Sequence, residues 1–276
     1  MPTIIKRLTP TALLDVDYTA DTLKSAEDHE TSDGIYTVTI TYNSTQTLMF
    51  GAHLDRLEDS AKRENIPLQI DRPRLKATLR QMILDSGYGD VRFRITVPRE
   101  TPDEMIITIE PFTLPSKMLI EQGVRCITSN AGARNNPAAK TTDWIHARRT
   151  LEANMPDGIY DTFLLNPDGM ILEGLGSNFY AILKGELRTA GEGVLSGISQ
   201  RIVFEVHQGI IPLRKDPVHV DEIPKFSEAF LTSSSRGIIP VIEIDGIAIG
   251  DCKVGEKTKL LRHAYDTWMN HHLEEL

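Results

Sequence analysis

Two stretches of the sequence decide the fold: Asn136-Pro137-Ala138-Ala139-Lys140-Thr141-Thr142-Asp143-Trp144 and Leu164-Leu165-Asn166-Pro167-Asp168-Gly169-Met170-Ile171-Leu172-Glu173-Gly174-Leu175-Gly176-Ser177-Asn178-Phe179. The first places Lys140 after a Pro-Ala-Ala run and just before a predicted helix over residues 142–154. The second predicts a hairpin over residues 159–183 that turns at Pro-Asp-Gly. Glu173 ends its apolar run, so we expect this carboxylate at the inner end of a strand.

Lys140 and Glu173 are the first candidates for chemistry. A lysine with small neighbours can be drawn inward, and burial lowers its pKa because it disfavours the ammonium form. A neutral amine is what Schiff-base chemistry needs, so Lys140 is a candidate covalent attachment point. A carboxylate at the inner end of a strand needs a cationic or donor partner. Taken alone, either residue is better explained as a solvated charge, since such side chains are usually exposed.

Two later blocks follow in order: Leu195-Ser196-Gly197-Ile198-Ser199-Gln200-Arg201, and a Ser/Thr-rich loop within residues 230–241 that ends in Pro-Val. With them, the chain resembles the class IV (fold type IV) pyridoxal-phosphate-dependent aminotransferase family. Members of that family have a lysine, a helix, a hairpin ending in Glu-Gly-x-x-x-Asn, then Leu-x-Gly-Ile-Thr-Arg and a Ser/Thr-rich loop. The resemblance covers most of the chain, and its pattern is closest to D-amino acid transaminases and branched-chain aminotransferases.

The resemblance implies the cofactor pyridoxal 5'-phosphate, with Lys140 as its attachment point and catalytic residue and Glu173 at the pyridine nitrogen. Leu195 matches the residue packed on the cofactor ring and would serve equally as core. The implied cofactor-binding residues are Arg56, Lys140, Glu173, Leu195, Gly197, Ile198, Ser199, Ser233 and Ser234.

Three of these groups are candidates for the phosphate. Gly197-Ile198-Ser199 opens a predicted helix, whose N–H groups and dipole favour an anion. Ser233 and Ser234 add loop hydroxyls. Arg56 stands in a stretch similar to the family's His-x-x-Arg-Leu block, where the arginine binds phosphate bidentately. The alternative for Arg56 is a surface helix arginine paired with Asp59.

The implied substrate-binding residues are Tyr36, Arg92 and Arg94. Tyr36 matches the family's aromatic residue near the substrate. The two arginines stand two apart on a predicted strand and share a face. Arg94 is the closer match to an arginine that the branched-chain enzymes use near the substrate carboxylate. Equally, both arginines could be solvated strand residues without a role in substrate binding.

The chain also departs from the family pattern. The family's Gly-Asp-Gly-Val-Phe/Tyr-Glu appears as residues 32–37, Ser-Asp-Gly-Ile-Tyr-Thr, without the glutamate. Ile145 stands where the branched-chain group commonly has tyrosine, and Arg99-Glu100-Thr101-Pro102 does not clearly form the Arg-x-His carboxylate site of the D-amino acid group. The segments 240–246 and 253–255 look most like D-amino acid transaminases.

Size and composition bound the remaining choices. The 276 residues can bury a large core and hold two compact domains. The net charge of −9 argues against nucleic acid and anionic membranes as partners. Neither the two cysteines nor the eight histidines have metal-ligand spacing, so we expect no metal. Without a signal peptide or membrane span in the pattern, a cytoplasmic location is expected.

The order of elements predicts an α+β class, because strands and helices mix without a regular βαβ alternation. We expect a smaller α+β domain over 1–112, a connection over 113–123 and a larger α+β domain over 124–276 that holds the cofactor lysine. The first half should contain strands at 35–42, 47–50, 91–97 and 105–109 and helices at 51–64 and from Asp71 to Gly87. The second half should add strands at 124–128, 229–232 and 238–244, a helix from Gly197 and a closing helix at 257–272.

These expectations give a transaminase that moves an amino group between an amino acid and a 2-keto acid, with D-amino acids favoured and L-branched-chain substrates as the alternative. The freed Lys140 amine would move the proton of the substrate as general base and acid. Two rivals are a lyase of the aminodeoxychorismate type and a non-catalytic ligand-binding protein on the same fold. The resemblance also implies a homodimer, in which a loop of the partner subunit lines the substrate pocket.

Overall fold

The computed structural model describes residues 2–130 and 136–276, and the chain divides into two compact units. The first unit consists of Met1–Thr113, Ala139–Ala147 and His272–Leu276, and the second of Leu114–Ala138 and Arg148–His271. The sequence placed a boundary at 113–123 and assigned Lys140 to the second domain. The structure groups Lys140 with the first unit, where its segment forms backbone hydrogen bonds to a strand.

The first unit contains β1 (Ile4–Leu8), β2 (Leu13–Asp15), α1 (Leu23–Ala26), the 3-10 helix η1 (Glu27–His29), β3 (Gly34–Tyr42), β4 (Gln46–Leu48), α2 (Phe50–Arg63), α3 (Arg72–Ser86), β5 (Val91–Pro98), β6 (Met105–Pro111) and β17 (Leu273–Glu275). The helix α5 (Thr142–Ala153) begins in its residues 139–147.

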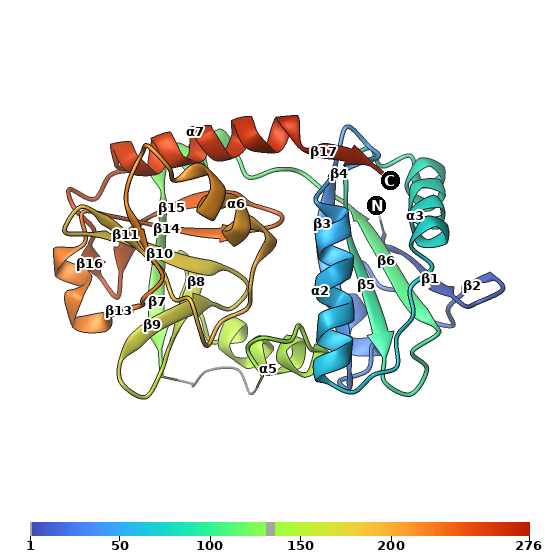
Figure 1. Cartoon of the computed structure of the whole chain (residues 1–276). Coiled ribbons are helices and arrows are strands. Elements are labelled where there is room, and N and C mark those ends of the chain that lie inside the picture. The colour runs from blue at the N-terminus through green and yellow to red at the C-terminus, as the bar shows by residue number, and fades with distance from the viewer. Residues whose placement is uncertain (1, 131–135) are drawn as a thin grey trace. The chain divides into compact units, whose positions relative to one another are not determined.

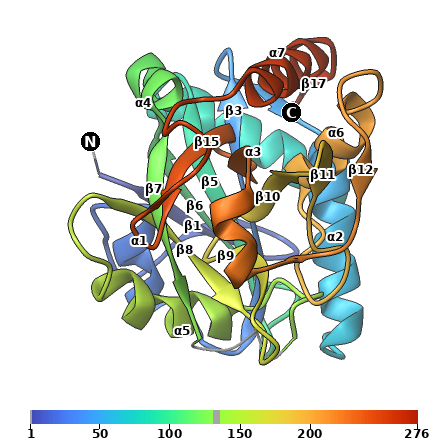
Figure 2. The ribbon, with the colours of Figure 1, turned by 90° about the vertical axis from the view of Figure 1, so that its left-hand side faces the viewer.

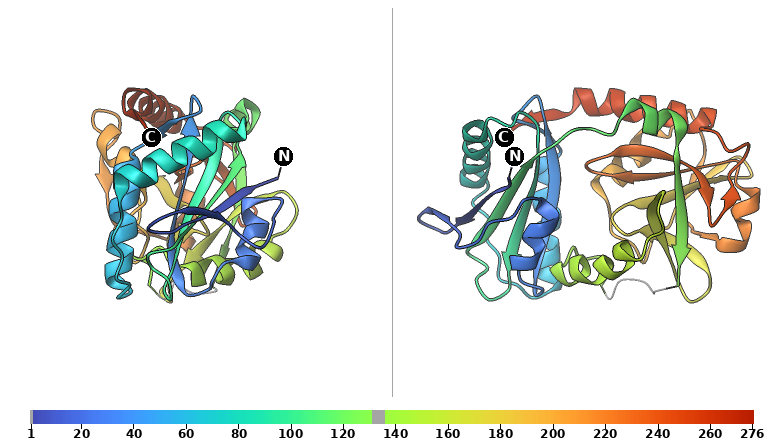
Figure 3. Two further views of the ribbon diagram at one scale, coloured as in Figure 1. Left: turned by 90° about the vertical axis from the view of Figure 1, so that its right-hand side faces the viewer. Right: turned by 180° about the vertical axis from the view of Figure 1, so that it is seen from behind.

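The first unit is built on an antiparallel sheet in the order β17-β4-β3-β5-β6-β1-β2. Alternate strand residues such as Ile35, Phe93 and Ile107 point to one face, where they meet the apolar stripes of α2 and α3. Figure 1 shows α2 lying along the sheet, and the left view of Figure 3 looks onto α2 and α3 together. On the opposite face Ala26 of α1 packs against β1 and β6, with α1 in blue in the right view of Figure 3.

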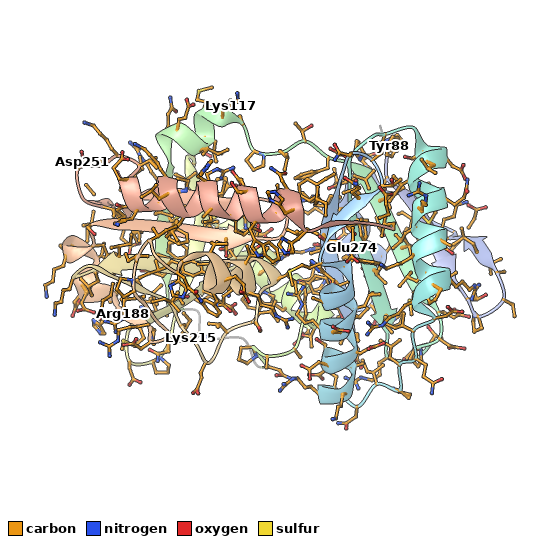
Figure 4. The ribbon with its side chains drawn as sticks, turned by 45° about the horizontal axis from the view of Figure 1, so that its top comes forward. Tyr88, Lys117, Arg188, Lys215, Asp251 and Glu274 are labelled. Carbon is orange, nitrogen blue, oxygen red and sulfur yellow. The ribbon has the colours of Figure 1, made fainter. Side chains whose placement is uncertain are left out.

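Local signals set the ends of α3. Asp71 caps its N-terminus by accepting from the backbone N–H of Arg74, Pro73 stands in the first turn, and Gly87 ends the helix with a left-handed φ of 65°. The end of the chain is held by β17. Its Glu274 accepts a 3.2 Å hydrogen bond from the backbone N–H of Gly51 at the start of α2 (Figure 4).

The second unit contains α4 (Lys117–Gln122), β7 (Val124–Ser129), β8 (Ile159–Leu165), β9 (Met170–Gly174), β10 (Asn178–Leu183), β11 (Glu186–Arg188), α6 (Ile198–Val206), β12 (Leu213–Arg214), β13 (Val218–His219), the 3-10 helix η2 (Val220–Lys225), β14 (Glu228–Ser233), β15 (Gly237–Ile244), β16 (Ile247–Ala248) and α7 (Glu256–His271).

The second unit is built on a mixed sheet in the order β12-β11-β10-β14-β15-β7-β8-β9-β13, in which β7 runs parallel to both β15 and β8. This sheet curls until β9 also pairs with β10, through Glu173 and Asn178. Figure 2 shows β7, β8 and β9 following one another across it. The interior of the curl is apolar and includes Phe163, Phe179 and the buried Cys126. The pairing of β9 with β10 brings Glu173 next to the residues that follow the hairpin.

The predicted α+β class is confirmed, and each predicted helix and strand has a counterpart within a few residues. The elements that the sequence did not predict are short: β1, β2, α1, η1, α4, β11, β12, β13, η2, β16 and β17. Across the described ranges, no helix is both long enough and apolar enough to cross a bilayer. Within the same ranges, no group of three or more His, Cys, Asp or Glu side chains is placed to hold a metal ion.

Candidate active site

Lys140 is anchored through its backbone in the first unit. Its carbonyl accepts a 3.0 Å hydrogen bond from the N–H of Tyr36 on β3, and the next residue, Thr141, forms a β-bridge with Ile35. Its own N–H donates to Oγ of Ser60 on α2 at 3.1 Å. The small Ala139 is completely buried beside it. The predicted small-residue stretch therefore lets the chain approach β3 and α2 closely at Lys140.

The side chain of Lys140 is half-buried and lies over an aromatic ring. Its Nζ stands 4.4 Å from the centre of the Tyr36 ring, and Tyr36 is 2% exposed. This contact is attractive for a lysine ammonium group and brings the amine against the ring face. The structure thus brings together Lys140, the predicted attachment point, and Tyr36, a predicted substrate-binding residue.

Arg56 lies on α2, and its backbone is connected to that of Lys140 through Ser60. It is buried, with 6% of its surface exposed, and its backbone carbonyl accepts a 2.8 Å hydrogen bond from the Ser60 hydroxyl. Arg56 is therefore not a surface arginine, and Asp59 forms an ion pair with Arg63. Ser60 links Arg56 to Lys140, and sequence reasoning missed it. Its only sequence signal is its place one helical turn after Arg56.

The three predicted substrate-binding residues share one face of the first sheet. Val38 of β3 pairs with Arg94 of β5, so these two residues lie on the same face. Tyr36 is two residues from Val38 and Arg92 is two residues from Arg94, and residues two apart on a strand point to the same face. This is the face opposite to α2 and α3. The predicted common face of the two arginines is confirmed.

Both arginines carry intramolecular ion pairs. Arg92 donates through Nε to Glu110 at 2.7 Å. Arg94 is 2% exposed and donates to Glu27 at 2.9 Å and to Glu30 at 2.6 Å. A substrate carboxylate would have to compete with these acids for either guanidinium group. Substrate binding by Arg92 and Arg94 stays a prediction, and the contacts of Arg94 also give it a structural role.

Glu173 belongs to the second unit, where it is 5% exposed at the end of β9. Its Oε2 accepts a 3.1 Å hydrogen bond from the backbone N–H of Leu195. A buried carboxylate needs such donors, because burying an unpaired charge is costly. A carboxylate can also accept more than one hydrogen bond, including one from a ligand. The predicted position at the inner end of a strand is confirmed.

Asn178 fixes the segment that Glu173 contacts. Its Nδ2 donates to the carbonyl of Leu195 at 3.0 Å, while its backbone pairs with Glu173. A Cβ on Gly197 would lie 2.1 Å from Oδ1 of Asn178, so this close approach needs glycine. Leu195 itself is 9% exposed, consistent with either of its two expected roles.

Asp161 on β8 holds the turn between Glu173 and Asn178. Its carboxylate accepts from the N–H of Leu175 at 3.1 Å and from Oγ of Ser177 at 2.8 Å, and it is 4% exposed. A Cβ on Gly174 would lie 2.9 Å from the same carboxylate. Sequence reasoning missed Asp161, because an aspartate in an apolar strand has no motif that ties it to residues fourteen positions away.

The start of α6 is suited to an anion. Gly197 is its N-cap and has no side chain with which to cap the helix. The N–H groups of the first turn and the helix dipole then favour a negative group, as the sequence predicted for Gly197-Ile198-Ser199. Ser199 is 2% exposed, and its Oγ is 2.9 Å from the hydroxyl of Tyr265 on α7.

The predicted loop serines lie between β14 and β15 and are half-buried. Oγ of Ser233 accepts a 2.8 Å hydrogen bond from Nε of Arg236, whose Nη2 also donates to the carbonyl of Gly176 at 3.3 Å. Arg236 therefore ties the loop of Ser233 and Ser234 to the turn that follows Glu173.

The second unit brings together Glu173, Leu195, Gly197, Ile198 and Ser199. Lys140 and Arg56 belong to the first unit.

Comparison with known proteins gives the same family as the sequence motifs. The family model described as "Amino-transferase class IV" matches residues 34–244, which include every residue assigned above to the cofactor or the substrate. A putative branched-chain-amino-acid aminotransferase of Methanocaldococcus jannaschii is 29% identical over 254 residues, covering 84% of this chain and 86% of the relative. A D-alanine aminotransferase of Listeria innocua is 24% identical over 264 residues, covering 86% of this chain and 87% of the relative.

Solved structures give the same fold. The crystal structure of a putative branched-chain amino acid aminotransferase from Thermotoga maritima is similar with a TM-score of 0.78 and 24% identity, over 96% of both chains. The expected fold type is thereby confirmed.

Proposed function

Because this chain belongs to the class IV aminotransferase family, whose members depend on pyridoxal 5'-phosphate, we propose that it is a transaminase in which Lys140 and Glu173 do the chemistry. The enzyme would move an amino group between an amino acid and a 2-keto acid. Under this proposal Lys140 is the covalent attachment point of the cofactor, and Glu173 is the partner of its ring nitrogen.

One observation supports the cofactor roles most directly. The buried carboxylate of Glu173 accepts a hydrogen bond from the N–H of Leu195, and two residues later Gly197 is the N-cap of α6. A single short segment thus joins an acid suited to a ring N–H with N–H groups suited to a phosphate. The donors and acceptors of the second unit therefore fit pyridoxal 5'-phosphate. Ser199, Ser233, Ser234 and Arg56 would add hydroxyls and a guanidinium group for the phosphate.

When bound, the cofactor supplies an electron sink for the bond that breaks at the substrate α-carbon. The carboxylate of Glu173 would keep a proton on the ring nitrogen, because a negative charge beside that nitrogen favours its protonated form. The amine of Lys140 would act as general base and general acid for the proton on the substrate α-carbon. Tyr36 would position this amine, because Nζ lies 4.4 Å from the centre of its ring.

The substrate assignment has two candidates. D-amino acids are favoured by segments 240–246 and 253–255, and a D-alanine aminotransferase is among the relatives. L-branched-chain amino acids are the second candidate, because relatives with that name match the chain over a similar length. In either case Tyr36, Arg92 and Arg94 are the proposed substrate-binding residues.

A panel of D- and L-amino donors with 2-oxoglutarate or pyruvate as acceptor tests the function. We expect amino transfer that requires a keto acid, together with a visible absorption band from the bound cofactor. Release of pyruvate from aminodeoxychorismate without any keto acid would indicate a lyase instead. Cofactor binding without any turnover would indicate a ligand-binding protein.

We also propose a cytoplasmic homodimer in which a loop of the partner subunit completes the substrate site. Light scattering and activity assays across a dilution series should show that activity falls as the dimer dissociates. A monomer with full activity at every concentration would contradict this part of the proposal.

A further inference from the structure

The hydroxyl of Tyr265 reaches the start of α6 from a distant part of the chain. It lies 2.9 Å from Oγ of Ser199, and both side chains are 2% exposed. Figure 1 shows α7, which carries Tyr265, running beside β15 and α6. Burial is the main reason that the pKa of Tyr265 is raised, to about 12. The phenol therefore keeps its proton at neutral pH and is able to donate.

The helix α7 is anchored over the two turns that precede this contact. At its start, Glu228 of β14 accepts from the N–H of Thr258 at 2.7 Å and from its hydroxyl at 2.7 Å. One turn before Tyr265, Leu261 is completely buried, and Arg262 donates to the carbonyl of Ile238 on β15. The Tyr265 hydroxyl is thus held at a fixed place relative to Ser199.

A hydroxyl group has one proton to donate and two lone pairs that accept. If Ser199 accepts from Tyr265, its own proton is available for an anion at the start of α6. A serine also lacks the β-branch that restricts the χ1 rotamer of threonine, so a partner has more influence on where its hydroxyl points. Tyr265 is such a partner.

We propose that Tyr265 is a positioning residue for the phosphate group of the cofactor: its hydroxyl donates to Ser199, which directs the Ser199 proton at a phosphate oxygen. This inference rests on the proposed function, since it deepens the assignment of Ser199 to the cofactor. Tyr265 does not touch the phosphate itself. Its effect is therefore confined to ligands that carry a phosphate and depends on Ser199.

The test compares two ligands on the apo-protein, pyridoxal 5'-phosphate and pyridoxal, which lacks the phosphate. Tyr265→Phe should weaken binding of the phosphate form about five- to tenfold, the size expected for one lost hydrogen bond, and leave pyridoxal binding unchanged. Ser199→Ala should weaken the phosphate form selectively as well. The double variant should bind like Ser199→Ala alone, because the tyrosine acts through the serine.

Leu261→Val is the matched control, because it disturbs the packing of α7 without removing a hydroxyl. It should affect both ligands equally or neither. Three outcomes would overturn the inference. The control could lose affinity for the phosphate form alone, or Tyr265→Phe could lose affinity equally for both ligands. The losses of the two single substitutions could also add in the double variant. Incorporation of 3-fluorotyrosine at position 265 keeps the ring and makes the hydroxyl a stronger donor, so it should tighten binding of the phosphate form. Weaker or unchanged binding there would also count against the inference.

The two levels of the proposal fail differently. Wild-type protein that binds neither ligand would refute the proposed function. Wild-type protein that binds pyridoxal 5'-phosphate, with Tyr265→Phe indistinguishable from it, would refute only the role of Tyr265.

Discussion

Nζ of Lys140 lies 4.4 Å from the centre of the Tyr36 ring, and the backbones of the same two residues are joined by a 3.0 Å hydrogen bond. The strand β3 therefore positions both the chain and the amine at Lys140. An amine that must attack one carbon atom benefits from such a restraint, because orientation is a large part of catalysis.

The ring of Tyr36 is expected to matter more than its hydroxyl for the position of Lys140. Tyr36→Phe should attach the cofactor at the wild-type rate, since it keeps the ring face. Tyr36→Leu should attach it about two- to fivefold more slowly, because the amine loses the ring face that orients it. Stopped-flow absorption after mixing apo-protein with cofactor measures the rate. Equal rates in both variants would show that the ring contact has no effect.

Glu173→Gln keeps the shape of the side chain and an oxygen that can accept from Leu195. The cofactor should still bind. Proton abstraction from the substrate should slow by orders of magnitude, because the ring nitrogen loses the charge that holds its proton. Single-turnover absorption measurements follow this step, with the exposed Glu192→Gln as a control. Wild-type rates in Glu173→Gln would mean that another carboxylate faces the ring nitrogen.

Gly197→Ala should damage the start of α6. The new Cβ would lie 2.1 Å from Oδ1 of Asn178, so the hydrogen bond between Asn178 and Leu195 must break or shift. We expect a loss of about 1–3 kcal/mol in the free energy of unfolding, together with weaker cofactor binding. Gly51→Ala is the control, because a Cβ there meets nothing and helix propensity should raise stability by about 0.5–1 kcal/mol. Urea titration of both variants checks the difference in sign.

Arg94 and Arg92 should respond differently to substitution by methionine. Arg94→Met leaves Glu27 and Glu30 buried without their cation and should lower the free energy of unfolding by about 3–5 kcal/mol. Arg92→Met removes the cation beside Glu110, which is buried but still accepts from the N–H of Leu23, and should cost about 1–3 kcal/mol. Urea unfolding separates the two. Wild-type stability in Arg94→Met, with a raised KM, would instead make Arg94 a substrate residue without a structural role.

Local patterns were enough to predict the long elements of the fold. The ends of α3 follow from Asp71, Pro73 and Gly87, which act within one helical turn. By contrast, β17 has three residues and no local signal, and it forms only because β4 lies at the edge of the first sheet. Pairings of this kind depend on the tertiary fold, so periodicity along the chain does not contain them.

The candidate site divides in the same way. Lys140 and Glu173 stand in ordered motifs and could be named from the sequence. Ser60, Asp161 and Tyr265 form hydrogen bonds to residues between 14 and 80 positions away. None of the three stands in a sequence motif that would single it out from its helix or strand. The motifs also do not indicate which compact unit contains Lys140. Its grouping with the first unit depends on a backbone hydrogen bond to β3, which only the tertiary structure shows.

The central claim is that Lys140 holds the cofactor. Borohydride reduction of the cofactor-bound protein, followed by proteolysis and mass spectrometry, should find the pyridoxyl group on Lys140. Lys140→Ala should retain only non-covalent cofactor and lose turnover, whereas the exposed Lys62→Ala should behave like wild type. A pyridoxyl group found on another lysine of the wild-type protein, with Lys140 unmodified, would contradict the account.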